Sequence, residues 1–260
     1  MPIGPSRPLN LTKPESIDIR QAARYFGARG EADSATLALL ERCAAPLLAA
    51  ATPRAVWLEA DVESLAQVGI LKGEDIFRHL EGCREALLLA VTLGPGADSQ
   101  IRRAGVGDIA AGVASDALGS ALAEQAADAA EAELRQWAAG QDRYLTGRFS
   151  PGYGDWPIGV QPLVAAALDT ARRVGLCVTE NDLMTPRKSV TALLGLSDHP
   201  VKGHLAGCGH CKVSGIFSFL SKSSSLLILD SFFKALFNSS SFSNGFSTSS
   251  SALCNCCNVF

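Results

Sequence analysis

The stretch of sequence that constrains this chain most is Arg148-Phe149-Ser150-Pro151-Gly152-Tyr153-Gly154-Asp155-Trp156-Pro157. Its two prolines and two glycines exclude a regular helix and predict a rigid, kinked backbone. Rigidity alone does not require the arginine, the tyrosine, the aspartate and the tryptophan that the same stretch carries. A fixed loop with a cation and aromatic rings is one way to present a small polar ligand. We therefore expect a loop that could hold a small anion.

Two side chains of this loop allow two interpretations each. Arg148 could be a surface arginine paired with Asp142 or Asp155, or it could be a rigid fork that grips a carboxylate or phosphate at two points. Tyr153 could stack on a ligand or fill the core. Their position on a constrained loop favours a functional role for both.

Composition limits the class of protein. A chain of 260 residues can bury one good core with appendages. A net charge of −3 without a basic run argues against nucleic acid and against a membrane surface as partners. No unbroken apolar run reaches about 18 residues, so we predict no transmembrane helix. The N-terminus does not resemble a signal peptide, and we expect a cytoplasmic protein.

The composition changes abruptly after Lys212. Residues 214–260 contain 15 serines and 8 phenylalanines, whereas the first 213 residues contain only three phenylalanines. We divide the chain into an N-terminal arm (1–15), a globular domain (16–212) and an atypical Ser/Phe-rich tail (213–260). A shifted reading frame in the source gene is our hypothesis for the tail, and we place no function in it.

The order of the predicted elements favours an α+β fold. Strands do not alternate strictly with helices, and several strands are short, which argues against a doubly wound parallel sheet. Ser16 is the expected cap of the first helix. The predicted helices span 16–26, 35–50, 73–80, 108–139 and 160–170, and the predicted strands span 54–60, 85–93, 174–179 and 188–196.

Glycines after the second predicted strand imitate a dinucleotide-binding turn. Gly94-Pro95-Gly96 lacks the third glycine, and no acidic residue follows a second strand at the expected interval. We interpret the segment as a structural turn.

Cysteines offer a weak alternative function. Cys43, Cys83 and Cys177 lie among apolar neighbours and are expected to be reduced core residues. Cys208 and Cys211 frame a string like that of disulfide isomerases, but loop residues precede it and serines follow. A metal site there would need two further ligands.

The longest predicted helix carries a regular polar stripe. Asp116, Ser120, Glu124 and Asp128 recur every four residues, which places them on one face. We expect most of them to be solvated opposite an alanine-rich core. A carboxylate that points inward would suit a ligand bearing an ammonium or sulfonium group.

Several blocks of sequence, taken in order, resemble a known family. From about Tyr25 to Cys211 the chain is similar to the activation domain of vitamin B12-dependent methionine synthase, in particular to its short, stand-alone forms. The blocks that carry the resemblance are His79-Leu80-Glu81-Gly82-Cys83, Ala90-Val91-Thr92-Leu93-Gly94, the stretch from Arg148 to Asp155, Leu176-Cys177-Val178-Thr179-Glu180 and Pro186-Arg187-Lys188-Ser189-Val190-Thr191-Ala192.

The resemblance implies a fold and an activity. The fold would be a C-shaped single domain with a twisted antiparallel sheet and flanking helices. The domain would bind S-adenosylmethionine and support reductive methylation of cob(II)alamin, in trans, on a cobalamin-dependent methionine synthase or a related corrinoid methyltransferase. A flavodoxin-like protein would supply the electron. The chain would act as an accessory component, and whether it is itself an enzyme stays open.

The resemblance also assigns roles to residues. Arg148 would hold the carboxylate of S-adenosylmethionine, the backbone around Ser150 would contact its adenosine part, and Glu124 would lie near its methionine part. Tyr153 and Gly152 would face the cobalamin.

Two positions depart from the family. Leu193-Leu194 stands where the full-length synthases carry an aromatic ligand contact, and Asp18 sits in a context unrelated to their N-terminal acidic ligand. Two other functions remain as alternatives. One is a docking module for corrinoid proteins that makes no use of S-adenosylmethionine, and the other is a metal or redox protein that uses Cys208 and Cys211.

Overall fold

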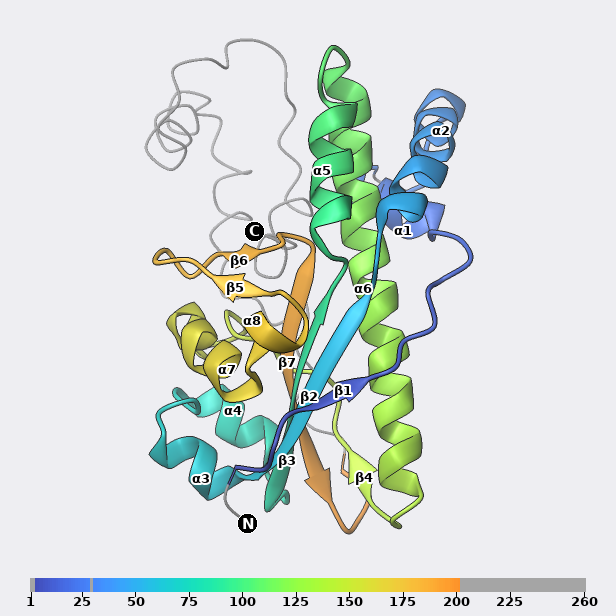
Figure 1. Ribbon diagram of the computed structural model, residues 1–260. Helices are drawn as coiled ribbons and strands as arrows, with labels where there is room; N and C mark the ends of the chain where they lie inside the picture. The colour runs from blue at the N-terminus through green and yellow to red at the C-terminus, as the bar shows by residue number, and fades with distance from the viewer. Residues whose placement is uncertain (1–2, 29, 202–260) are drawn as a thin grey trace, which may run out of the picture.

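The computed structural model describes residues 3–28 and 30–201, and Figure 1 shows their arrangement. The strands are β1 (Arg7–Leu9), β2 (Arg54–Asp61), β3 (Glu85–Thr92), β4 (Tyr144–Leu145), β5 (Cys177–Val178), β6 (Met184–Thr185) and β7 (Ser189–Ser197). The helices are α1 (Ile19–Phe26), α2 (Ser34–Ala50), α3 (Val62–Gln67), α4 (Glu74–His79), α5 (Pro95–Ala104), α6 (Ile109–Ala139), the 3-10 turn η1 (Ile158–Val160), α7 (Gln161–Leu168) and α8 (Thr170–Arg173).

A five-stranded antiparallel sheet organises the domain. Its strand order is β1-β2-β3-β7-β4, and β5 and β6 form a separate two-stranded hairpin. In the register, Leu89 of β3 lies opposite Trp57 of β2 and Ala192 of β7. The predicted α+β class with an antiparallel sheet and flanking helices is confirmed. The C-shaped outline stays a prediction.

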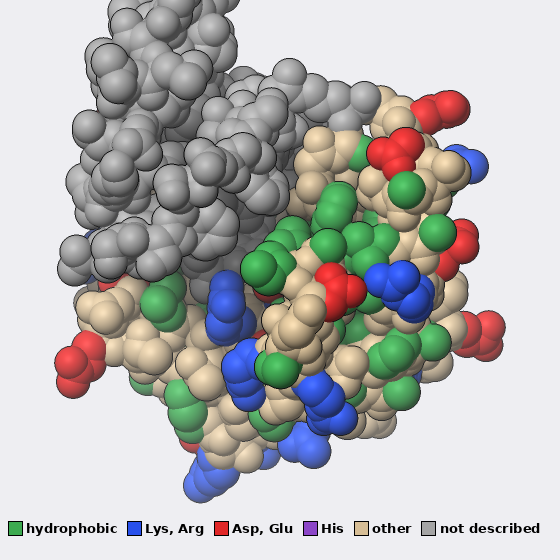
Figure 2. Space-filling view, turned by 90° about the horizontal axis from the view of Figure 1, so that it is seen from above, with side chains coloured by type: hydrophobic (Ala, Val, Ile, Leu, Met, Phe, Trp, Pro, Cys, Tyr) green, Lys and Arg blue, Asp and Glu red, His purple; other side chains and the backbone are tan. Residues whose placement is uncertain are grey.

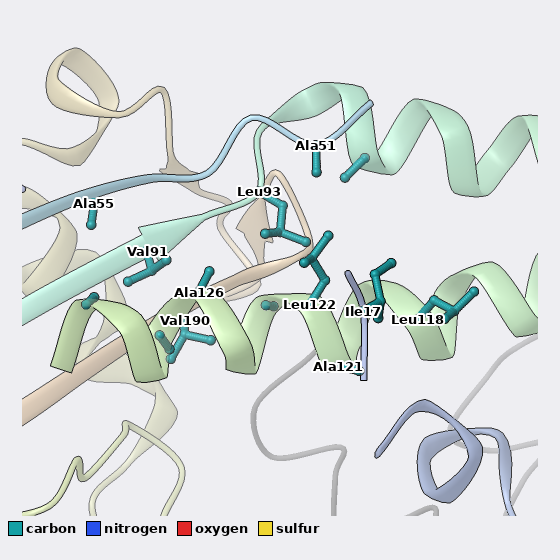
Figure 3. Packing of buried hydrophobic residues seen from close by; sticks show 14 of the residues in the cluster. Ile17, Ala51, Ala55, Val91, Leu93, Leu118, Ala121, Leu122, Ala126 and Val190 are labelled. Atoms are coloured by element: carbon teal, nitrogen blue, oxygen red, sulfur yellow. The ribbon is translucent and has the colours of Figure 1, made fainter. Parts of the chain in front are cut away.

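Helices cover both faces of the sheet, so β3 is buried on both sides. Leu87, Leu89 and Val91 point into a core shared with α1, α2 and α6, part of which is drawn in Figure 3. Leu88 and Ala90 point into a second core shared with α3, α4 and α7. This alternation with period two divides the apolar residues of one strand between two layers.

Glycines bring α6 close to its neighbours. A Cβ atom at Gly112 would lie 2.8 Å from the Cα of Gly105, near the α5–α6 turn. A Cβ atom at Gly119 would lie 3.1 Å from Cε of Lys188, which crosses the helix there. Both contacts are tighter than an ordinary van der Waals contact, so the missing side chains at these two glycines allow the close approach of α6 to its neighbours.

Several local predictions need correction. The cap of α1 is Asp18, whose Oδ1 accepts the backbone N–H of Gln21 at 3.0 Å, and not Ser16. The predicted strand at 174–179 is only the two-residue β5. Cys43 is buried as predicted, but Cys83 is half-buried and Cys177 is exposed, so the core assignment is wrong for Cys177.

The structure describes most of the N-terminal arm but not the C-terminal tail. Within the arm 1–15, Arg7–Leu9 forms β1, which pairs with β2 at the edge of the sheet. The tail 213–260 lies outside the described residues, as do Cys208 and Cys211. None of the helices in the described ranges is both long and apolar enough to cross a bilayer.

Candidate functional site

The aromatic residues of the loop 148–157 anchor it in the second core. Trp156 is 1% exposed, and its Nε1–H donates a hydrogen bond to the carbonyl of Ile70 at 2.8 Å. Phe149 exchanges two backbone hydrogen bonds with Leu193 of β7, at 2.9 and 2.8 Å. These two rings serve the fold and leave the polar residues of the loop to be explained.

Asp155 caps α4 from outside that helix. Its carboxylate oxygens accept the backbone N–H groups of Glu74 at 2.8 Å and Asp75 at 2.9 Å. Asp75 returns the contact, because its Oδ2 accepts the N–H of Asp155 at 3.1 Å. Two N–H groups that a helix start leaves without a partner are thereby satisfied. Asp155 is therefore not the counter-ion of Arg148, and that alternative is wrong.

We expect Asp155→Ala to lower the free energy of unfolding by about 1–2 kcal/mol, because it removes a helix cap. Asp155→Asn keeps one acceptor oxygen and is expected to cost roughly half as much. Urea unfolding of the two variants measures both values. Equal losses for the two variants would contradict capping as the cause.

Arg148 is enclosed by carboxylates of α6. Its Nη2 lies 3.2 Å from Oε2 of Glu124 and 2.7 Å from Oδ1 of Asp128, and its Nη1 lies 3.1 Å from Oε2 of Glu131. The guanidinium side chain is 15% exposed. Asp142, the other surface partner considered, is not among these carboxylates. The structure thus joins Arg148 and Glu124, which the sequence analysis had linked only through a ligand.

A second arginine fixes one of these carboxylates. Nε of Arg135 donates to Oε1 of Glu131 at 2.9 Å, and its Nη1 and Nη2 donate to the carbonyls of Leu145 and Thr146 at 2.8 and 2.7 Å. We name Glu124, Asp128, Glu131, Arg135 and Arg148 the α6 charge cluster. Three carboxylates and two guanidinium groups give this cluster one net negative charge.

Burial leaves polar groups in this cluster short of partners. Burial is the largest influence on Glu124 and raises the pKa of its carboxyl, although Arg148 opposes the shift. Burial also lowers the pKa of Arg148, but the neighbouring carboxylates outweigh it and leave that pKa raised. Nη1 of Arg148 is buried and makes no hydrogen bond within the described chain, despite its ion pair with Glu131. Such an orphaned donor needs a physical explanation.

Tyr25 of α1 is a member of this region that the sequence analysis missed as a site residue. Burial raises the pKa of its half-buried phenol most, and the charges of Glu124 and Asp128 raise it further. Its hydroxyl accepts a hydrogen bond from Nε2 of Gln21 at 3.4 Å. The only signal for this tyrosine in the sequence was that the resemblance to the family begins there.

The other half of the α6 stripe holds a buried lysine. Nζ of Lys188 lies 3.0 Å from Oδ1 of Asp116 and donates to Oγ of Ser120 at 3.1 Å. Lys188 is 1% exposed, and burial lowers its pKa despite Asp116. The predicted single face of the stripe is confirmed. Its interpretation as a solvated surface holds for Asp128 and Asp116, whose side chains are 67% and 42% exposed. It is wrong for Ser120 and Glu124, which are largely buried beside cations of other segments.

The remaining predicted site residues lie next to the loop core. Ser150 is 4% exposed, and Gly152 has a φ of 95°, a conformation that favours glycine. Tyr153 is half-buried with its ring edge-on to Phe149, at 5.7 Å between centroids. Leu193-Leu194 is fully buried in β7, so this position presents no surface to a ligand.

His79 contacts the backbone just before the loop 148–157. It is 1% exposed, and its Nε2 lies 3.0 Å from the carbonyl of Gly147 and 2.9 Å from Oγ1 of Thr146. Oγ1 of Thr146 also accepts the N–H of Gly195 at 2.8 Å. These contacts hold the peptide that precedes Arg148 between α4 and β7.

One end of the molecule exposes apolar side chains. Figure 2 views the molecule from the end where α5 and α6 meet, and it shows hydrophobic side chains gathered there. In and after the α5–α6 turn, Val106 is 83% exposed, Ile109 75% and Val113 43%. Grouped exposed apolar residues are typical of interaction surfaces.

Within residues 3–28 and 30–201, no group of three or more histidine, cysteine, aspartate or glutamate side chains is placed to hold a metal ion. The glycines of Gly94-Pro95-Gly96 serve packing: a Cβ at Gly96 would overlap the carbonyl oxygen of Ala50. β3 before this turn has antiparallel neighbours, so the interpretation of a structural turn is confirmed.

The chain has a distant likeness to known proteins in its fold but not in its sequence. No family model matches the chain, and no curated protein matches it in sequence. Among solved structures, the chain is similar to the MetH reactivation domain in its crystal structure bound to AdoHcy, with a TM-score of 0.49 and 15% identity over 79% of this chain and 82% of that one. At these values the likeness does not show that the chain belongs to that family.

Proposed function

We propose that the chain binds S-adenosylmethionine at the α6 charge cluster and supports reductive methylation of cob(II)alamin on a cobalamin-dependent methionine synthase or a related corrinoid methyltransferase. The observation that carries the proposal is the buried Arg148 fork with an orphaned Nη1 beside the desolvated carboxylate of Glu124. The sequence blocks around Arg148 and Lys188 support the corrinoid context. A cytoplasmic location remains a prediction.

The residues fit the amino-acid end of this ligand. A carboxylate would give Nη1 of Arg148 the hydrogen bond that it lacks and, together with Nη2, make a two-point contact. Glu124 would face the ammonium group, since a buried carboxylate with one weak partner gains from a second cation. The backbone at Ser150 would meet the adenosine part. S-adenosylmethionine would supply the methyl group and a flavodoxin-like donor the electron.

The partner-facing part of the proposal rests on the loop and the exposed patch. Tyr153 and Gly152 would face the corrinoid, because the half-exposed end of the loop lies beyond the buried Phe149. The apolar residues Val106, Ile109 and Val113 support contact with another protein. We expect the chain to act as an accessory component of the partner methyltransferase.

Titration calorimetry with S-adenosylmethionine tests the binding step. We expect Arg148→Ala to weaken binding about 10- to 100-fold, because it removes charge-assisted hydrogen bonds to the ligand carboxylate. Arg143→Ala is the matched control, since Arg143 pairs with Glu59 and Glu85 instead. No heat from the unmutated chain, or equal effects of the two variants, would contradict the proposal.

The visible spectrum of a cob(II)alamin-loaded partner tests the second step. With a reductant, conversion to methylcobalamin is expected only when both the chain and S-adenosylmethionine are present. A spectral change that the chain causes without S-adenosylmethionine would favour the corrinoid-docking module instead. The metal or redox alternative concerns Cys208 and Cys211, and metal analysis of the full chain addresses it.

A further inference from the structure

The three carboxylates around Arg148 are not held equally. Glu124 is 18% exposed and Glu131 is 19% exposed, and Glu131 is fixed in addition by Arg135. The side chain of Asp128 is 67% exposed, and the one hydrogen bond that its carboxylate makes with the described residues is the 2.7 Å contact from Nη2 of Arg148. Asp128 is therefore the carboxylate that can leave the guanidinium at the lowest cost.

The carboxylates of α6 already occupy the guanidinium of Arg148, so a ligand carboxylate must displace one of them. A two-point contact needs both Nη1 and Nη2. Nη1 makes no hydrogen bond but is buried beside Oε2 of Glu131 at 3.1 Å, and Nη2 is shared by Glu124 and Asp128. A ligand carboxylate can make that contact only after one of these two side chains has moved, and Glu124 is the buried one.

We infer that Asp128 is the exchangeable counter-ion of Arg148, which a ligand carboxylate replaces and which then turns to the cationic groups of the same ligand. This inference rests on the proposed binding of S-adenosylmethionine at the cluster. Asp128 stands one helical turn from Glu124 on the same face of α6, so both carboxylates border the space that the ligand would enter. The exchange makes Asp128 a specificity-determining residue.

The charge of the cluster sets the class of ligand. The cluster already carries one net negative charge, so a simple anion on Arg148 would add a second in a poorly solvated place. A ligand with a carboxylate and at least one cationic group a few atoms away avoids this cost. S-adenosylmethionine has a carboxylate, an ammonium and a sulfonium, and it belongs to this class.

A comparison of two ligands separates exchange from simple attraction. Decarboxylated S-adenosylmethionine keeps both cationic groups but has no carboxylate to compete with Asp128. We measure the affinity for S-adenosylmethionine divided by the affinity for the decarboxylated form. In Asp128→Asn, we expect this ratio to rise about 3- to 10-fold. Simple attraction by Asp128 would weaken both ligands alike and leave the ratio unchanged, which would overturn the inference.

The controls distinguish this failure from failure of the proposed function. Glu133→Gln removes an exposed carboxylate of the same helix and is expected to leave the ratio unchanged. Binding of S-adenosylmethionine with an unchanged ratio in Asp128→Asn contradicts the exchange alone. Absence of binding of both ligands to the unmutated chain contradicts the function and the exchange together.

Thermal unfolding without ligand gives an independent measurement. Asp128→Asn is expected to change Tm by less than about 1 °C, whereas Glu131→Gln is expected to lower it by several degrees, because Glu131 links Arg135 to Arg148. A loss in Asp128→Asn as large as that in Glu131→Gln would show that Asp128 is not free to leave, and would overturn the inference.

Discussion

Replacement of Trp156 by alanine is expected to lower the free energy of unfolding by about 3–5 kcal/mol. Trp156 is among the largest fully buried side chains, and it packs with Phe149 at 6.0 Å between ring centroids. Its loss would leave a cavity in the second core beside Phe149, and neighbouring side chains could fill it only if the backbone moved. Urea unfolding followed by far-UV circular dichroism measures the change.

Trp156→Phe separates the cavity from the hydrogen bond. Phenylalanine keeps much of the ring but leaves the carbonyl of Ile70 without the donor that it has at 2.8 Å. We expect this variant to cost about 1–3 kcal/mol, the penalty of an unsatisfied buried acceptor with a smaller packing loss. A free energy of unfolding that is the same in Trp156→Ala as in the parent would contradict the anchoring role of the loop.

The loop shows what sequence reasoning could and could not give. Its prolines and glycines predicted a rigid turn, because these residues act through local backbone geometry. The roles of Asp155 and Trp156 were missed, since their partners Glu74 and Ile70 lie about eighty residues earlier in the chain. Nothing local encodes which helix start an aspartate will cap.

The polar stripe of α6 shows the same limit. Spacing by four residues predicted one face, since helix geometry alone fixes it. The surroundings of that face depend on Arg148 and Lys188, which other segments deliver. Solvation was therefore predicted wrongly for Ser120 and Glu124, and the role of Glu124 toward a ligand stays a prediction.

The strands with a local apolar pattern were predicted, and a strand that depends on distant pairing was not. The apolar runs in β3 and β7 predicted both strands within one residue at each end, because both faces of these strands are buried. β1 was missed, since Arg7–Leu9 shows no alternation and is a strand only through its pairing with β2. Edge pairing of three residues leaves no period to detect.

Asp116→Asn is expected to cost about 2–4 kcal/mol of stability near neutral pH. The variant leaves the charge of Lys188, which is 1% exposed, without its carboxylate partner at 3.0 Å. Removal of the partner of a buried charge costs more than removal of both groups, because an unpaired charge remains in the interior. Here Lys188 is that charge, and the Asp116 side chain is 42% exposed. Lys188→Met in the same background is therefore expected to restore most of the loss.

The loss in Asp116→Asn should also depend on pH in a defined direction. Burial already holds the pKa of Lys188 below its usual 10.5, and the loss of Asp116 removes the largest opposing influence. Asp98 still raises that pKa and Arg187 lowers it. With the folded pKa below the unfolded one, the unfolded chain binds more protons between the two values, so stability rises with pH in that window.

Urea unfolding at about pH 7 and about pH 10 compares the variants in that window. The deficit of Asp116→Asn relative to the parent is expected to shrink at the higher pH, because the folded variant then holds Lys188 as a neutral amine. Lys188→Met together with Asp116→Asn has no amine to titrate and should show no such recovery. A deficit that is the same at both pH values would mean that the loss of Asp116 leaves the protonation of Lys188 in the folded chain unchanged, and that the two side chains are not coupled.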